Sequence, residues 1–256
     1  MIESKNRYGR TAARIHDADG LARRPSSPTI DIHAHIVVPQ ASAVAQPYVD
    51  LSRIPLAHFA DDITKDINAQ QEKDVREVMT TIDRRLTHLD QMGIDIQVIA
   101  PAPGQCYYTV DPKIAENAHR LANDGVAEYC SRKPDRFVGL GVVTLQEPEL
   151  AVRELDYIMG TLKLRGVEIL TNVDGQELSD PKFRPFFARA EQLGAFIMMH
   201  PNGFTHGQRL THYYFSNVLG NPLDTTLALH NLIFSGTLAR LPVGLPSGSS
   251  GSGPSR

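Results

Sequence analysis

Five short apolar runs alternate with helix-like segments along this chain, and this order constrains the fold more than any other feature. The runs lie near residues 29–39, 95–101, 137–143, 166–170 and 195–201. Segments with an apolar residue every three or four positions follow them, at about 72–92, 111–132, 148–160, 181–194 and 222–238. Such alternation predicts an α/β fold with a parallel sheet, either doubly wound or a (β/α)8 barrel.

The ends of these runs favour the barrel. No Gly-x-Gly-x-x-Gly turn follows the first run, which weighs against a dinucleotide-binding fold. His35 and His200 lie near the carboxyl ends of the first and fifth runs, where barrel enzymes place their active sites. Because only five runs are visible, we expect an incomplete TIM barrel with about five of its eight strands.

The chain divides into three parts by composition. Residues 1–28 are Arg-rich and aperiodic, and we expect a disordered leader. Residues 29–242 carry the partial barrel. Residues 243–256 consist mainly of Gly, Ser and Pro and are expected to form a flexible tail, so the barrel is expected to be truncated at its C-terminal side.

Charge and apolar content exclude several partners. The net charge of −3, without a basic stripe, argues against nucleic acid. No apolar run reaches membrane-spanning length, no signal core is present, and the two cysteines have no disulfide or metal spacing. We expect a cytoplasmic protein without a membrane partner. The segment 222–238 is apolar on several sides, which fits a buried core helix, a homodimer contact or the loss of neighbours.

Three histidines are candidate metal ligands. Side chains alternate along a strand, so Asp31, His33 and His35 are expected on one face of the first strand. His200 ends the fifth strand and can face the same barrel mouth. Three imidazoles on one divalent ion form an open site with room for a substrate. The alternative is that these histidines are hydrogen-bonded within the core.

A family resemblance adds to this pattern. Its residues are Asp31–His35, Arg85–Asp95, Asn117–Asn123, Pro134–Phe137 and His200-Pro201. From about Thr29 to Pro242 the chain resembles the decarboxylase branch of the amidohydrolase superfamily, the group of the aminocarboxymuconate semialdehyde decarboxylases.

The resemblance implies a distorted (β/α)8 barrel of the metal-dependent hydrolase type with a single divalent ion, zinc first and manganese as the alternative. His33, His35 and His200 match its metal ligands. Its remaining ligand, an aspartate of the eighth strand, and its acid/base histidine after the sixth strand have no counterpart here, so the catalytic residue stays unknown. The fourth run lacks the lysine that bridges two metals in binuclear relatives, but it contains Glu168, for which a structural role or a partnership with a base is open.

The activity implied is that of a carboxy-lyase acting on a small unsaturated or aromatic carboxylic acid resembling 2-amino-3-carboxymuconate semialdehyde. A hydrolase or hydratase on the same scaffold and a catalytically inactive fragment are the alternatives. A carboxylate substrate needs a cation, and Arg76 is the candidate by placement against the family, with a solvated surface arginine as the alternative. Asn202 and Phe204, after the fifth run, and Pro103–Tyr108, after the second, are expected at the pocket mouth.

Overall fold

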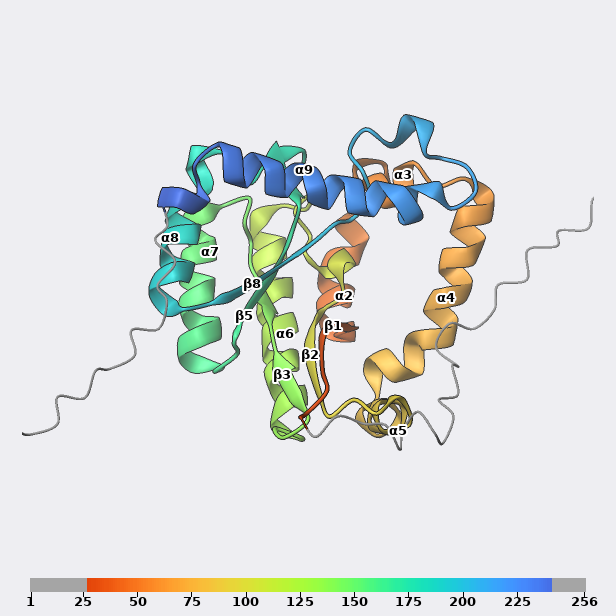
Figure 1. Ribbon diagram of the computed structural model, residues 1–256, viewed down its shortest axis with the longest axis vertical. Helices are drawn as coiled ribbons and strands as arrows, with labels where there is room; N and C mark the ends of the chain where they lie inside the picture. Colours follow the sequence, from red (N-terminus) through yellow and green to blue (C-terminus); the bar gives the residue numbers. More distant parts are fainter. Residues whose placement is uncertain (1–26, 241–256) are drawn as a thin grey trace, which may run out of the picture.

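The computed structural model describes residues 27–240 and shows an α/β fold with parallel sheets (Figure 1). One sheet has the order β1-β2-β3 and another the order β4-β5-β8. Their bounds are Ile30–Ile36 for β1, Ile96–Pro101 for β2, Phe137–Gly139 for β3, Gly141–Val142 for β4, Gly166–Leu170 for β5 and Phe196–His200 for β8. The expected leader, apart from Ser27 and Pro28, and the expected tail lie outside the described residues.

The sheet order follows the chain order. All strand pairs in these two sheets are parallel, and β3 and β4 are the two parts of the predicted third strand, divided at Leu140. In a doubly wound sheet, strands are instead added on both sides of the first strand, so the order in the sheet does not follow the order in the chain. An additional antiparallel pair, β6 (Asn172–Val173) and β7 (Gln176–Glu177), follows β5. Within residues 27–240 the parallel strands do not form a closed eight-stranded barrel.

Helices separate the strands. Their bounds are Pro39–Ala45 for α2, Pro55–His58 for α3, Asp62–Thr80 for α4, Ile82–Met92 for α5, Pro112–Ser131 for α6, Pro148–Asp156 for α7, Arg184–Leu193 for α8 and Asn221–Phe234 for α9. The prediction of one helix over 72–92 is wrong, since Thr81 is extended, with φ −121° and ψ 121°, and divides α4 from α5. Two consecutive β-branched threonines weaken the helix at this point.

Several helix ends follow from the sequence. Asp111 caps α6 by accepting a hydrogen bond of 2.9 Å from the Lys113 backbone N–H, and Pro112 occupies the first turn. Gly93 and Gly194 end α5 and α8 in the left-handed conformation, with φ values of 71° and 62°. These caps fix where the chain enters the next strand.

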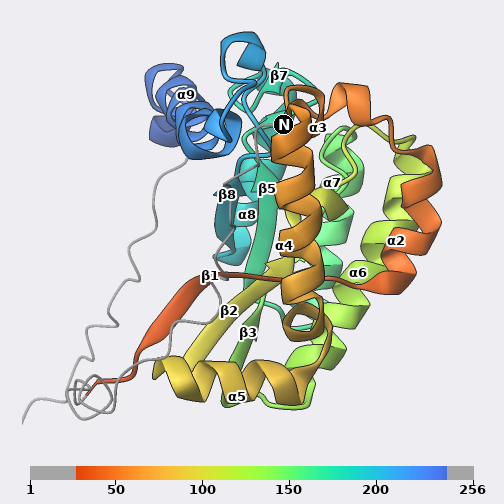
Figure 2. The ribbon, with the colours of Figure 1, turned by 90° about the vertical axis from the view of Figure 1, so that its right-hand side faces the viewer.

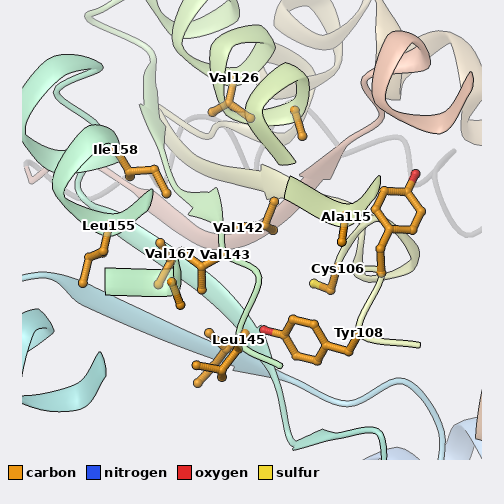
Figure 3. Close-up of a cluster of buried hydrophobic side chains, with 14 of the residues drawn as sticks. Cys106, Tyr108, Ala115, Val126, Val142, Val143, Leu145, Leu155, Ile158 and Val167 are labelled. Atoms are coloured by element: carbon orange, nitrogen blue, oxygen red, sulfur yellow. The ribbon is translucent and has the colours of Figure 1, made fainter. Parts of the chain in front are cut away.

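The main core lies between the strands and the helices α2, α6 and α7, which Figure 2 shows on one side of the strands. Figure 3 shows part of this core, in which Leu155 and Ile158 of the α7 region lie near Val142 and Val167 of the strands. All four side chains are fully buried, and each buried side chain of this size contributes roughly 1.5–3 kcal/mol. The core therefore anchors β4 and β5 firmly.

The outer strands are less covered. β1 and β8 are the end strands of their sheets, and Ile30 and Ile32 on β1 are 52% and 61% exposed. Although residues 29–39 form an apolar run, the first half of β1 is therefore not buried. Phe196, which begins β8, is also exposed. Within the described residues, no further strand pairs with either outer edge.

Helix α9 lies across the carboxyl ends of the strands (Figure 1). Its Asp224 accepts hydrogen bonds from the Thr171 hydroxyl, directly after β5, and from the Thr205 backbone N–H, after β8. Apolar side chains lie on more than one side of this helix: Ala228 and Leu232 are buried, whereas Leu229, Ile233 and Phe234 are exposed. No helix in the described part of the chain is long and apolar enough to cross a bilayer.

Candidate metal centre

The structure brings His33, His35 and His200 together. The three ring centroids lie 4.9–5.1 Å apart, and the Nε2 atoms of His33 and His35 are separated by 3.2 Å. One nitrogen from each ring lies within 4.8 Å of the others. His33 and His35 come from the second half of β1, and His200 is the last residue of β8. Two strands far apart in sequence thus place their carboxyl ends around one point.

A bulge in β1 sets which side chains face this point. Asp31 pairs with Gln97 and Ala34 with Ile99, so three residues on β1 span two on β2. Gln97 and Ile99 share a face, and Asp31 and Ala34 therefore share one too. The predicted alternation that placed Asp31 beside the histidines is wrong. Its carboxylate instead accepts a 2.7 Å hydrogen bond from the Gln97 side-chain amide.

The second nitrogen of His200 has a hydrogen bond, and that of His35 lies near a carboxyl group without hydrogen-bond geometry. His200 Nδ1 lies 2.6 Å from the Pro201 carbonyl oxygen and can donate to it, which leaves Nε2 free. His35 Nδ1 lies 3.4 Å from a carboxylate oxygen of Glu168 on β5, while its Nε2 lies close to His33. Metal-bound histidines in proteins typically have this arrangement, with one nitrogen on the ion and the other on an oxygen acceptor.

Two of the imidazoles, those of His35 and His200, are held in the neutral form near neutral pH. Burial, with smaller contributions from His200 and His33, lowers the pKa of His35 to about 3. Burial also lowers the pKa of His200. Neutral imidazole is the form that binds metal, so the cluster needs little proton release to accept an ion. Three imidazole nitrogens that converge on one point fit a divalent ion of the zinc or manganese type.

A buried arginine supports the strand that carries two of the histidines. The guanidinium of Arg85, on α5, donates 2.6 Å to the backbone carbonyl of His35, 2.8 Å to Gln97 Oε1 and 3.1 Å to the Val78 carbonyl. Arg85 is only 3% exposed. It therefore joins α5, β1 and β2 at the level of the metal cluster.

A cavity of about 250 Å³ opens at the carboxyl ends of the strands, next to the residues that follow β2, β5 and β8. Its lining includes Arg53, His58, Pro103, Gly104, Tyr107, Tyr108, Leu170, Thr171, Asp174 and Asn202. Of the predicted substrate residues, Asn202 lies in this wall, whereas Phe204 does not. Arg76 is exposed on α4 and is also absent from the lining.

Arg53 lines the cavity but was not among the site residues predicted from the sequence. Its guanidinium donates 3.0 Å to the Thr109 carbonyl and pairs with Asp174, so it connects three loops of the cavity wall. Residues 40–70 show little periodicity, and no pattern in the sequence distinguishes this arginine from its neighbours. The Asp50 carboxylate caps the short helix Leu51–Arg53, which ends at this arginine, and so fixes the local backbone.

The loop after β8 closes against α3. The Leu56 backbone N–H donates 3.1 Å to the Asn202 carbonyl. Gly203 adopts φ 89°, and a Cβ at this position would lie 2.1 Å from the Leu56 nitrogen. Only glycine permits this approach, which places Asn202 in the cavity wall.

Comparisons with known proteins give one family. A model of the family described as amidohydrolase matches residues 30–245. A 2-amino-3-carboxymuconate-6-semialdehyde decarboxylase from Dictyostelium discoideum is 31% identical over 214 residues, which are 83% of this chain and 60% of that protein. A gamma-resorcylate decarboxylase from Rhizobium radiobacter is 32% identical over 127 residues, 46% of this chain and 38% of that protein.

A solved structure shows the same fold. It is a crystal structure of 5-carboxyvanillate decarboxylase from Novosphingobium aromaticivorans, complexed with manganese and 4-hydroxy-3-methoxy-5-nitrobenzoic acid. The match has a TM-score of 0.72 at 22% identity and covers 85% of this chain and 63% of that chain. This chain thus spans about 60% of the length of the proteins that it matches over most of its own length.

Proposed function

This chain belongs to the amidohydrolase family, whose model matches residues 30–245, and from this membership we propose that it is a metal-dependent carboxy-lyase. The proposed substrate is a small unsaturated or aromatic carboxylic acid of the kind named for its relatives, 2-amino-3-carboxymuconate semialdehyde first. In such a reaction the carboxyl group leaves as carbon dioxide and a proton takes its place.

The observation that carries the proposal is the convergence of three imidazoles at the carboxyl ends of β1 and β8. A cavity opens at the same ends of the strands, although none of the three histidines lines it. His33, His35 and His200 would hold one divalent ion. We propose zinc, with manganese as the alternative because the Novosphingobium structure is described with manganese. When bound, the ion supplies a Lewis acid for oxygens of the substrate.

The cavity wall offers groups for a carboxylate. Arg53 contributes a guanidinium, which binds carboxylates through two parallel hydrogen bonds, and Asn202 contributes an amide. Burial raises the pKa of Tyr108 well above its usual value of 10, so its phenol stays protonated near neutral pH. Arg53 replaces Arg76 as our preferred substrate cation, because Arg53 lines the cavity and Arg76 does not. Phe204 does not line the cavity and lies near Gly220.

We further propose that the described sheet is part of a distorted (β/α)8 barrel. The sequential strand order supports this, as does the match to a barrel-family structure over 63% of its chain. Among residues 27–240 the metal group contains three histidines and no carboxylate. This favours a second candidate function, metal binding without turnover. It corresponds to the catalytically inactive fragment that was one of the alternatives from the sequence.

Two further elements belong to the same proposal. The exposed apolar side chains of α9 support association into a homodimer, because monomers rarely expose contiguous apolar surface. A cytoplasmic location is supported by two free cysteines, Cys106 and Cys130, which a reducing compartment would preserve.

The test is carbon dioxide release by the purified chain loaded with zinc or manganese. The substrates are 2-amino-3-carboxymuconate semialdehyde, gamma-resorcylate and 5-carboxyvanillate, with parallel detection of hydration and hydrolysis products. We expect carbon dioxide from at least one acid and its loss in His200→Ala. Hydrolysis or hydration products without carbon dioxide would contradict the proposal, and an ion bound without any product would favour the second candidate.

A further inference from the structure

Glu168 is a buried acid for which the proposed function has no role. It lies in the middle of β5, its side chain is 0% exposed, and neither carboxylate oxygen has a hydrogen-bond partner. A buried polar group without a hydrogen bond costs roughly 1–3 kcal/mol of stability, and more when it is charged. We therefore expect a neighbour of Glu168 whose interaction with the carboxyl group offsets this loss of stability.

That neighbour is His35. On the adjacent strands Glu168 lies opposite Val142 and Met198, which offer no polar side chain for hydrogen bonding in pairs of this kind. The nearest ion-pair contact of its carboxylate is with His35 Nδ1, at 3.4 Å. This nitrogen is likewise buried without a hydrogen-bond partner. This nitrogen and the Glu168 carboxyl group thus lie close together, and the Pro101 backbone is the other acceptor near the His35 ring.

The contact fixes which side of the ring faces the cluster. With Nδ1 directed to Glu168, the other nitrogen of His35 lies 3.2 Å from His33 Nε2. For His200 the Pro201 carbonyl has the same effect, since it occupies Nδ1. An oxygen acceptor on the second nitrogen orients a metal-binding histidine and makes it a stronger ligand.

We propose that Glu168 is a positioning residue that holds the His35 ring with Nε2 toward the point shared by the three histidines. This inference rests on the metal site of the proposed function. It answers the question that the sequence left open, because the acid in the fourth strand is then the partner of a metal ligand on the first. Through this contact β5, in one sheet, acts on β1, in the other.

The test compares Glu168→Leu and Glu168→Gln with the unmodified chain. Zinc and manganese are titrated in competition with a chromophoric chelator. Loss of such an orienting partner typically weakens metal affinity about 10- to 100-fold, which we expect for Glu168→Leu. Glutamine keeps one acceptor oxygen but replaces the other by an amide nitrogen, so we expect an affinity about three- to tenfold weaker for Glu168→Gln.

A second measurement separates positioning from packing. Thermal unfolding of the metal-free chain should show Glu168→Leu to be at least as stable as the unmodified protein, because leucine removes an unpartnered buried carboxyl. A residue that only fills space would lose stability and affinity together. Glu154→Gln is the matched control, since Glu154 is a mostly buried acid that contacts Thr144 and His119 rather than His33, His35 or His200.

The metal affinities of the Glu168 and Glu154 variants support or overturn the inference. Weaker binding in both Glu168 variants, with Glu154→Gln within about twofold of the unmodified chain, supports it. Affinity within about twofold for both Glu168 variants overturns it, and if Glu168→Leu does not fold, Glu168→Gln measured against Glu154→Gln decides alone. An unmodified chain that binds neither ion also overturns it. A chain that binds metal without releasing carbon dioxide would refute only the proposed function.

Discussion

Replacing Arg85 tests how β1 is held at the metal cluster. The guanidinium of Arg85 donates to three acceptors, the His35 carbonyl, Gln97 Oε1 and the Val78 carbonyl, at 2.6, 2.8 and 3.1 Å. Arg85→Met keeps most of the side-chain length but removes every donor. The three acceptors are then left in a site that is only 3% exposed.

The magnitude follows from these contacts. A hydrogen bond from a charged donor contributes about 1.5–3 kcal/mol, and three of them would give a gross value of roughly 4.5–9 kcal/mol. Returning the guanidinium to water offsets part of this sum. Removing one partner from a buried charged network costs about 3–5 kcal/mol, and we expect Arg85→Met to lower the free energy of unfolding by this amount. The corresponding fall in Tm is roughly 6–20 °C for a chain of this size.

The assay is urea unfolding at pH 7 with Arg84→Met as the matched control. Arg84 is the next residue on α5, but its side chain is 60% exposed and lies 3.4 Å from Glu77. An exposed ion pair contributes little, so the control should change stability by less than about 1 kcal/mol. A loss in Arg85→Met no larger than in Arg84→Met would refute the reasoning that this guanidinium anchors β1.

Three further predictions follow from other contacts. Burial raises the pKa of Glu154 from 4.5 to about 7, so its native state binds the extra proton, and stability should fall as the pH rises from 4.5 to 7, by at most about 3 kcal/mol. Urea unfolding at pH 5 and pH 8 should show a smaller fall for Glu154→Gln, and equal pH slopes would count against this. Gly203→Ala should lose about 1–3 kcal/mol more stability than Gly175→Ala. Both glycines have positive φ, but only at Gly203 would a Cβ lie against backbone atoms, those of Leu56 and Pro55. Equal losses in the two variants would show that the close approach to Leu56 does not affect stability. Lysine at both Ile32 and Phe196, exposed on the end strands, should reduce self-association in sedimentation experiments, and unchanged association would exclude these edges as the contact.

The sequence predicted the elements that repeat a simple pattern. The five strand positions follow from apolar runs, and α6 begins at its Asp-Pro cap as expected. Gly93 and Gly194 end helices because an L side chain disfavours the left-handed conformation found there. Each of these signals is local, so a single stretch of sequence contains all the information needed.

Features that depend on distant contacts were harder to predict. The bulge in β1 results from pairing with β2, and it places Asp31 on the opposite face of the strand from His35. The break at Thr81 divided a helix whose apolar rhythm continues through it. Arg53 reaches the cavity through contacts with Thr109 and Asp174, which are far along the chain. Such positions are determined by tertiary structure, and periodicity contains no trace of them.

The histidine cluster lies between these two cases. Spacing on β1 indicated His33 and His35 as a pair, and the proline after His200 marked a strand end. Their meeting required the parallel strand order, which the alternation of elements predicts. The orienting contacts of Pro201 and Glu168 could be found only from coordinates.

The most direct test of the metal centre is X-ray absorption at the zinc edge of the chain loaded with one equivalent of zinc. We predict three imidazole nitrogens at about 2.0–2.1 Å around a single ion, with one fewer imidazole or no bound ion in His200→Ala. A zinc environment without imidazole, or a spectrum unchanged in His200→Ala, would contradict the claim that β1 and β8 share one metal ion.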